Sequence, residues 1–459
     1  MQFQTQKIAR EYFLAVLPLF LLQVIFGLVA SVKYVWGNDP LLYILPFNIA
    51  RTIHLNLLVF WLLLALMGAT YYMVADEIQA EIYSVKLARV QLGILLASGV
   101  VAVVGYFFQW SFGMPFLEQP TIIKLAIVVA AVLFLANIAM TMFRNHHQLT
   151  RTTATLFAGL IMLAIMFLFG IPFIPNMSTQ YYFWWWVIHL WVEGAWELIA
   201  ASLVAWCLMK LTGVPRKRVE GWVFAEVALV LLTGFIGTGH HYYWIGTPHY
   251  WLWWGAIFSA FEPVPIMLML VDSFRHIYGR THPIGNTLGL GWIAAGAFVH
   301  FMGAGVWGFG QTFPQINRWT HGTQITASHG HFAFWGAYGM LAIALMYTIL
   351  PEISGRPLQR RHRLGLLSFF LTNFGMIFIV MALLLAGVVQ VYMQRIMGLD
   401  FLEVQQHLRF WFEVRLVAGS VFLVGTILLI TDLVRLARPV AAQEAAAHYN
   451  SEPMVPEEA

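Results

Sequence analysis

Charged residues are scarce in this sequence of 459 residues, and cysteine is nearly absent. Lys, Arg, Asp and Glu make up 10% of the chain, against 60% hydrophobic residues, whereas an average soluble domain is about a quarter charged. This composition excludes a disordered chain, a nucleic-acid-binding module and a water-soluble globule. The single cysteine, Cys207, excludes an intrachain disulfide, a thiolate metal cluster and a haem attached through C-x-x-C-H. We therefore expect an integral protein of the lipid bilayer.

Long apolar runs occupy most of the chain. Because a bilayer-spanning helix needs about 20 mostly apolar residues, the sequence predicts an all-α fold with twelve transmembrane helices. Lys7 and Arg10 precede the first run as in a secretory signal, but that run is too long for one, and we interpret it as a retained helix. The predicted spans are 12–36, 49–75, 87–110, 120–143, 152–173, 180–212, 219–245, 250–275, 286–312, 321–350, 364–395 and 406–434.

The distribution of Lys and Arg predicts the orientation of these spans. With the N-terminus inside, the inner connections and tails carry eighteen Lys and Arg, and the outer connections carry seven. This asymmetry follows the positive-inside rule and places both termini in the cytoplasm. We predict one membrane domain over residues 1–438 and a disordered cytoplasmic tail over residues 439–459.

Histidines inside the predicted spans are the most informative residues. An ionisable side chain within the bilayer is costly and marks a functional site by default, although a hydrogen bond to a neighbouring helix is the better explanation of a single one. From the rise per residue, histidines of four spans fall in one layer, roughly 7–14 Å from the outer surface. Six lie in spans, and His300 and His321 are less clear: His54, His189, His240, His241, His329 and His331.

The spacing of these residues predicts a metal site. His189 and Glu193 are four residues apart, so both can bind one metal from the same helix face, which Glu197 continues. His240 and His241 differ by about 100° around a helix. Their joint binding to one metal therefore requires a local distortion, which nearby glycines permit.

The H-x-H pair predicts haem binding. His329 and His331 point to opposite sides of their helix, about 200° apart, and can serve two cofactors. The sequence thus offers three imidazoles and a carboxylate for a non-haem metal, His329 for one haem, and His54 with His331 for another. A haem with two histidines transfers electrons, whereas a haem with one histidine leaves a face open for a ligand.

Four strings resemble the haem–copper oxidase superfamily, and within it the catalytic subunits of bacterial nitric oxide reductases of the cytochrome-c-linked type. The resemblance covers nearly the whole chain and implies a bundle like subunit I of the oxidases. The strings are W-W-W-V-I-H-L-W-V-E-G-A-W-E (184–197), G-T-G-H-H-Y-Y-W-I-G (237–246), S-A-F-E-P-V-P (259–265) and H-G-T-Q-I-T-A-S-H-G-H (321–331).

This resemblance implies two b-type haems and a non-haem iron that convert two NO, two electrons and two protons into N2O and water. Glu197 and Glu262 would deliver protons to the site or tune it. The implied ligands are His54 and His331 for the low-spin haem, His329 for the high-spin haem, and His189, His240, His241 and Glu193 for the iron.

The outer surface departs from the family pattern at one position. Near the haem propionates, the family carries an acidic residue associated with calcium, three positions before a glutamate that corresponds to Glu118. This chain has Pro115 there, which supplies no carboxylate and leaves Glu118 as the candidate calcium ligand. Arg318 and His321 are candidate propionate contacts. The absence of a lysine in the middle of the sixth and eighth spans agrees with proton uptake from the outer face.

The electron donor is expected to be another protein. The chain has no C-x-x-C-H site or copper-binding domain, and it lacks the long N-terminal extension of quinol-linked relatives. The resemblance therefore implies a membrane-anchored cytochrome c subunit, docked on the outer side of a bacterial inner (cytoplasmic) membrane.

Two other functions compete with NO reduction. An oxygen reductase of the same superfamily usually carries copper, and many such enzymes place a tyrosine where Glu193 stands. A carboxylate added to three imidazoles favours iron over copper, and coupling two NO molecules needs no O–O cleavage. A proton-coupled transporter, the third possibility, does not require these ligand spacings at one depth.

Overall fold

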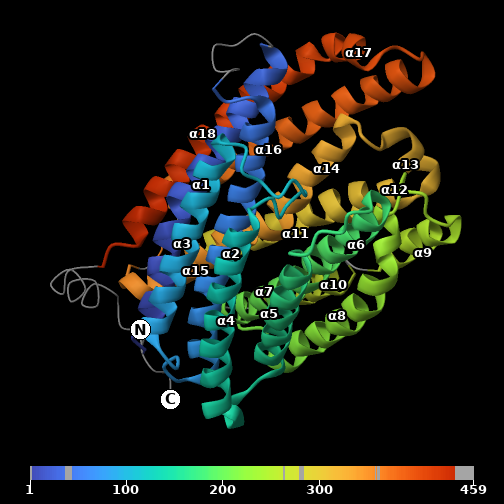
Figure 1. Cartoon of the computed structure of the whole chain (residues 1–459). Coiled ribbons are helices and arrows are strands. Elements are labelled where there is room, and N and C mark those ends of the chain that lie inside the picture. Colours follow the sequence, from blue (N-terminus) through green and yellow to red (C-terminus); the bar gives the residue numbers. More distant parts are fainter. Residues whose placement is uncertain are drawn as a thin grey trace.

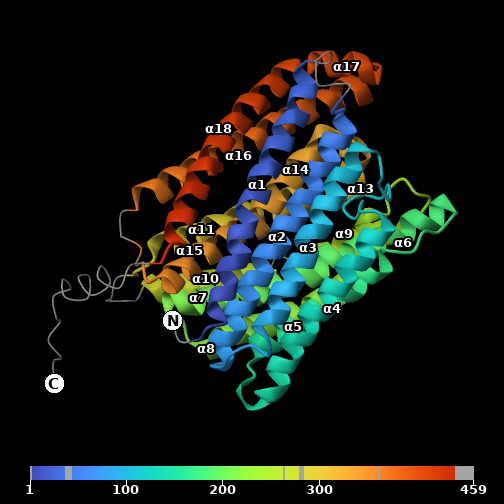
Figure 2. The ribbon, with the colours of Figure 1, turned by 60° about the vertical axis from the view of Figure 1, so that its left-hand side comes forward.

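The computed structural model describes residues 3–36, 44–261, 264–278, 284–356, 358 and 362–439. In these ranges the chain is an all-α bundle without β-strands, and twelve of its helical segments are long and apolar enough to cross a membrane (Figures 1 and 2). The first five spans are α1 (Gln6–Val35), α2 (Phe47–Ile78), α3 (Val85–Phe107), α4 (Thr121–Arg144) and α5 (Arg151–Phe169).

Five of the seven later spans contain a short segment of π- or 3-10 helix. The sixth is α6 (Met177–His189), η2 (Leu190–Ala195) and α7 (Trp196–Thr212), and the seventh is α8 (Arg216–Gly237) with η3 (Thr238–His241). The eighth is α9 (His249–Ser259) and α10 (Val264–Tyr278), and the ninth is α11 (Thr287–His300), η4 (Phe301–Gly308) and α12 (Phe309–Thr312). The tenth is α14 (Gln324–Phe334), η5 (Trp335–Gly339) and α15 (Met340–Ser354), the eleventh is α16 (Arg363–Gln390) with η6 (Val391–Ile396), and the twelfth is α18 (Arg409–Leu436). Shorter helices are η1 (His146–Gln148), α13 (Pro314–Thr320) and α17 (Phe401–His407).

The predicted fold class and the twelve spans are confirmed. The largest difference in a boundary is at the first span, which begins at Gln6 rather than at residue 12. Helices extend beyond the apolar run because their backbone hydrogen bonds continue to a capping residue. The predicted tail, 439–459, lies outside the described residues apart from Pro439.

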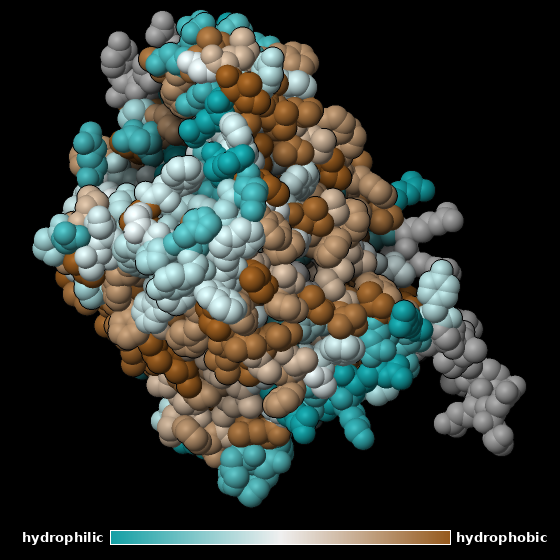
Figure 3. Space-filling model, turned by 90° about the vertical axis from the view of Figure 1, so that its right-hand side faces the viewer, coloured by the Kyte–Doolittle hydropathy of each residue, from teal (hydrophilic) through white to brown (hydrophobic). Residues whose placement is uncertain are grey.

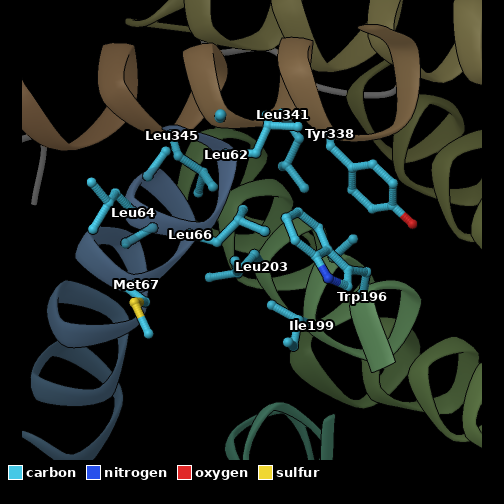
Figure 4. Close-up of a cluster of buried hydrophobic side chains, with 14 of the residues drawn as sticks. Leu62, Leu64, Leu66, Met67, Trp196, Ile199, Leu203, Tyr338, Leu341 and Leu345 are labelled. Atoms are coloured by element: carbon cyan, nitrogen blue, oxygen red, sulfur yellow. The ribbon is translucent and has the colours of Figure 1, made fainter. Parts of the chain in front are cut away.

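The most buried spans are the second, sixth and tenth. In each of them 83% of the most apolar stretch is buried, against 33–50% in the others. Figure 4 shows their contact, where Leu62 of α2, Ile199 and Leu203 of α7, and Leu341 and Leu345 of α15 pack together. These three spans also carry most of the histidines on which the predicted site depends, so the site is built on the best-packed helices.

A charged network joins the same three spans near the C-terminal ends of α2, α7 and α15. Lys210 of α7 places its Nζ 3.1 Å from Asp76 Oδ1 of α2 and 3.1 Å from Glu352 Oε2 of α15. Tyr72 donates a hydrogen bond to Glu352, and Trp206 donates one to Asp76 over 3.0 Å. This network fixes α2, α7 and α15 relative to one another.

The outer surface of the bundle matches a lipid environment. On the face in Figure 3, hydrophobic side chains cover a broad area between hydrophilic patches that lie nearer the ends. Such a surface is unfavourable in water and favourable in the hydrocarbon core.

Candidate functional site

The helix that carries His189 and Glu193 changes its winding at this point. α6 ends at His189, and the next six residues form the π-helix η2, which includes Glu193. His189 is fully buried, and its Nδ1 lies 3.3 Å from Glu193 Oε2. Short π-helical turns inside α-helices occur frequently at functional sites, because the wider turn redirects side chains. The imidazole and the carboxylate therefore face the same point.

The two adjacent histidines lie on a 3-10 turn, η3, at the end of α8. Their Nε2 atoms are 2.8 Å apart, although neighbouring residues of a regular helix point in different directions. Gly239 lets α9 approach this turn, since a Cβ there would lie 2.0 Å from the carbonyl oxygen of Trp251. The distortion that joint metal binding requires is thus present in the backbone.

The four side chains converge on one point, and we call them the metal cluster: His189, Glu193, His240 and His241. One ligand atom of each lies within 4.8 Å of those of the others. The carboxylate of Glu193 is 3.3 Å from His240 Nε2 and 3.2 Å from His241 Nε2. Three imidazole nitrogens and a carboxylate oxygen are a donor set that suits a divalent transition metal.

Two observations support a metal at this cluster. Nδ1 of His189 faces the Glu193 carboxylate, but its Nε2 has no partner among the described residues, and an unsatisfied buried polar atom costs about 1–3 kcal/mol. In addition, Nδ1 of His240 is hydrogen-bonded to the hydroxyl of Ser259 on α9, and His241 stacks on Trp185 with the ring planes 1° apart. Such second contacts orient the imidazoles of metal sites. The residues present therefore fit a bound metal ion.

A large cavity separates His54 of α2 from His331 of α14. Its volume is about 640 Å³, and it is lined by both histidines, by Gly27 and by aromatic residues such as Trp61 and Phe334. A Cβ on Gly27 would lie 2.7 Å from Cε1 and Nδ1 of His54, so the cavity wall requires glycine here. The space and its apolar lining suit a planar prosthetic group.

The two histidines are spaced to bind the same metal from opposite sides. Their ring centroids are 6.3 Å apart, with 30° between the ring planes. Since an imidazole nitrogen binds a transition metal at about 2 Å, two rings on opposite sides of one metal have centroids about 6 Å apart. Nδ1 of His54 is 2.8 Å from the carbonyl oxygen of Gln23, and Nδ1 of His331 is 2.8 Å from that of Ala327. These contacts favour the tautomers in which Nε2 carries the lone pair.

His329 belongs to a different environment from that of His331, two residues later on α14. Its Nδ1 is 2.8 Å from the carbonyl oxygen of Gly303 in the π-helix η4, and a Cβ on Gly308 would lie 2.7 Å from its Cε1. It lies close enough to Glu193 and His240 to interact with their charges. The H-x-H pair therefore places one histidine, His331, at the cavity and the other, His329, near the metal cluster.

The predicted acids have different surroundings. Glu197 lies in the first turn of α7, one turn beyond Glu193. Glu262 lies outside the described residues. Glu118 is 5% exposed; its carboxylate accepts a hydrogen bond from the Asn56 side chain and lies 3.9 Å from Arg51. Burial raises the pKa of Glu118 to about 7.

The two predicted propionate contacts are not among the residues that line the cavity. Arg318 is over the ring of Trp319, and the ring of His321 contacts that of Trp244. Arg51 and Arg415 are the arginines that line the cavity, and neither was predicted as a site residue. Arg51 could have been found, because it precedes His54 by three residues and shares its helix face. Arg415 has no comparable signal in the sequence.

This chain is similar in sequence to proteins of a known family. The family described as "Cytochrome C and Quinol oxidase polypeptide I" matches residues 7–421. A nitric oxide reductase subunit of Stutzerimonas stutzeri is 40% identical over 448 residues, which cover 93% of this chain and 94% of that protein. A cbb3-type cytochrome c oxidase subunit, CcoN1, of the same organism is 23% identical over 229 residues, 47% of this chain and 48% of that protein.

The fold has a counterpart among solved structures. A cryo-electron microscopy structure of a haem–copper terminal oxidase dimer matches with a TM-score of 0.77 and 15% identity. The match covers 95% of this chain and 85% of that chain. At this identity the similarity concerns the arrangement of the helices.

Proposed function

The chain belongs to the cytochrome c and quinol oxidase polypeptide I family, and on this premise we propose that it is the catalytic subunit of a nitric oxide reductase. It reduces two NO with two electrons and two protons to N2O and water. Its 40% identity to a nitric oxide reductase subunit over most of both chains supports this reaction. The observation in the site that carries the proposal is the carboxylate of Glu193 among three imidazoles, because this donor set favours iron over copper.

The cofactors are two b-type haems and one non-haem iron. His54 and His331 would hold the low-spin haem, His329 the high-spin haem, and the metal cluster the iron. When bound, these groups would carry the electrons from the donor and provide two neighbouring metal centres for the reduction of NO. The spacing of His54 and His331 and the unpartnered Nε2 of His189 support this assignment.

The protein's own part in the reaction is to orient its ligands and to balance charge. Backbone carbonyls hold His54, His329 and His331 by their Nδ1 atoms, and Ser259 does the same for His240. Fixed rings reduce the reorganisation that accompanies a change of charge. The carboxylate of Glu193 adds a negative charge, which balances positive charge on the bound metal ion.

Proton supply is the second task of the chain. Two protons are consumed for each N2O, and the site lies among buried apolar side chains. Glu197 stands one turn from Glu193 and can hold a proton beside the cluster. We assign the same role to Glu262 because it follows Ser259, the partner of His240, by three residues.

Two arginines that were not predicted as site residues line the haem cavity. Arg51 and Arg415 line the cavity, and we propose that they contact the haem propionates together with Arg318 and His321. Calcium takes about six to eight oxygen ligands. The described residues around Glu118 instead present the side-chain amide of Asn56 and a guanidinium to its carboxylate, and this set does not fit a cation.

The electrons come from a partner. We propose a membrane-anchored cytochrome c subunit on the outer side of a bacterial inner membrane, with both termini of this chain in the cytoplasm. The positive-inside distribution of Lys and Arg supports this orientation.

Formation of N2O from isotopically labelled NO tests the proposal. The purified complex with a reduced electron donor should convert NO to N2O, and Glu193→Gln should lower the rate at least ten-fold. Glu413→Gln changes an exposed acid on α18 and should match the wild type. A wild-type protein that consumes O2 but forms no N2O would contradict the proposed function.

A further inference from the structure

A tyrosine of the tenth span contacts the turn that carries Glu193, and the site described above gives it no role. Tyr338 lies in the π-helix η5 and is 5% exposed. Its hydroxyl donates a hydrogen bond of 3.0 Å to the carbonyl oxygen of Val192 in the π-helix η2. Val192 directly precedes Glu193 in the chain. The contact therefore joins the tenth span to the backbone that presents the carboxylate of the metal cluster.

The carbonyl of Val192 has lost its α-helical donor. In an α-helix it would accept a hydrogen bond from the N–H group of Trp196, four residues later. That N–H group is bonded instead to the carbonyl oxygen of Trp191, five residues earlier, as in a π-helix. Backbone carbonyls that are shielded from water are nearly always paired. The hydroxyl of Tyr338 thus supplies a donor at the place where the wider turn releases a carbonyl.

Ring contacts hold Tyr338 beside this turn. Its ring packs edge-on against that of Trp196, with the centroids 5.2 Å apart and 70° between the ring planes (Figure 4). Trp196 packs in the same way against Trp191 at 5.5 Å, and the ring of Phe334 lies 5.8 Å from that of Tyr338. Edge-on aromatic pairs have a preferred geometry. Packing that does not depend on the hydrogen bond therefore directs the hydroxyl toward Val192.

A second neighbour, α5, holds the same turn. A Cβ on Gly194 would lie 2.7 Å from Cε of Met162, and such close packing leaves η2 little room to move toward α5. The winding of a π-helix differs from that of an α-helix, so a return to regular α-helix would rotate Glu193 about the axis relative to His189. The hydrogen bond from Tyr338 opposes this rotation, because it binds the carbonyl that an α-helix would reclaim.

We propose that Tyr338 is a positioning residue for the non-haem iron: its hydroxyl holds the carbonyl of Val192 and thereby fixes the turn in which Glu193 faces the three histidines of the metal cluster. The inference rests on the proposed function, because iron is the metal proposed for this cluster. The role is one of orientation, and neither a proton nor an electron passes through the phenol. A carboxylate that is held in place beforehand loses less freedom when the metal binds, so the affinity for the metal is higher.

The iron affinity of Tyr338→Phe tests the proposal, because phenylalanine keeps the ring contacts and removes only the hydroxyl. The purified complex is titrated with an iron chelator, and the haem and iron retained per chain are measured. Tyr338→Phe should bind the non-haem iron about 10- to 100-fold more weakly and keep both haems. Replacement of Tyr338 by p-aminophenylalanine, which restores a donor on the same ring, should recover the affinity.

The matched control is Tyr347→Phe on α15. It removes another buried tyrosine hydroxyl of the tenth span, which donates to Asp432 over 2.8 Å. Since this bond does not involve the metal cluster, the iron affinity of Tyr347→Phe should equal that of the wild type.

A measurement on the wild type makes the test independent of any substitution. After the non-haem iron is removed, the amide groups of η2 should stay protected from hydrogen exchange, because the protein itself holds the turn. Loss of this protection would overturn the proposal, as would equal iron affinity in Tyr338→Phe and the wild type. Loss of both haems together with the iron in Tyr338→Phe would also overturn it, since the hydroxyl would then support the fold as a whole. A wild-type complex that contains no non-haem iron or forms no N2O would instead refute the proposed function.

Discussion

Two glycines provide a selective test of the haem assignment. A Cβ on Gly27 would lie 2.7 Å from Cε1 of His54, and a Cβ on Gly308 would lie 2.7 Å from Cε1 of His329. Ordinary contact begins at 3.4 Å, so alanine requires each ring to move by about 0.7 Å or to strain its surroundings. Each substitution therefore acts on a single proposed axial ligand without removing it.

The expected effect follows from the cost of such overpacking. Inserting a methyl group into a packed site costs about 1–3 kcal/mol, which corresponds to a weakening of about 5- to 150-fold if it falls on the bond between imidazole and iron. Gly27→Ala should diminish the low-spin haem signal and leave the high-spin haem and the non-haem iron unchanged. Gly308→Ala should change the high-spin haem alone.

Reduced-minus-oxidised absorption spectra and electron paramagnetic resonance of the purified variants separate the two haems. Gly221→Ala is the matched control, because a Cβ there would meet no atom within 4 Å. Wild-type spectra for both alanine variants, or a loss of the low-spin signal in Gly308→Ala, would refute the assignment of His54 and His329.

Three further predictions concern stability and metal affinity. Lys210→Met removes the cation from its network with the carboxylates of Asp76 and Glu352. This change should lower the free energy of unfolding by about 2 kcal/mol, because solvent partly screens the partly exposed network. An unchanged unfolding midpoint would contradict this prediction. Because burial raises the pKa of Glu118 to about 7 from 4.5, its contribution to stability is present below about pH 4.5 and is lost as the pH rises through about 7. Glu118→Gln should abolish this loss of about 3 kcal/mol, and equal pH dependence of thermal unfolding in both proteins would refute the reasoning. Ser259→Ala removes the contact to Nδ1 of His240 and should weaken iron binding about 10- to 100-fold in competition with a chelator, whereas an unchanged affinity would show that the hydroxyl does not orient the ring.

The sequence was sufficient to predict the spans and the convergence of the metal cluster. The number of spans follows from run length alone, because a bilayer requires about 20 apolar residues of a helix. His189 and Glu193 were expected to share a face from their spacing by four, and the structure brings them together across a π-helical turn. The 3-10 turn at His240 and His241 was expected as a distortion, although its form was not.

Contacts between helices that are far apart in the sequence could not be predicted from local sequence patterns. Arg415 lines the cavity because α18 packs on α1 and α16, and no local pattern encodes that packing. The closeness of Gly27 to His54 depends likewise on the contact of α1 with α2.

The central claim is that a carboxylate and three imidazoles hold an iron ion beside two haems in one chain. Total iron, haem b and copper per chain, measured on the purified complex with the contribution of its cytochrome c partner subtracted, test this claim most directly. The account predicts three iron atoms, two of them in haem b, no copper, and specific loss of the third iron in Glu193→Ala. One copper atom per chain, or iron equal to haem in the wild type, would contradict it.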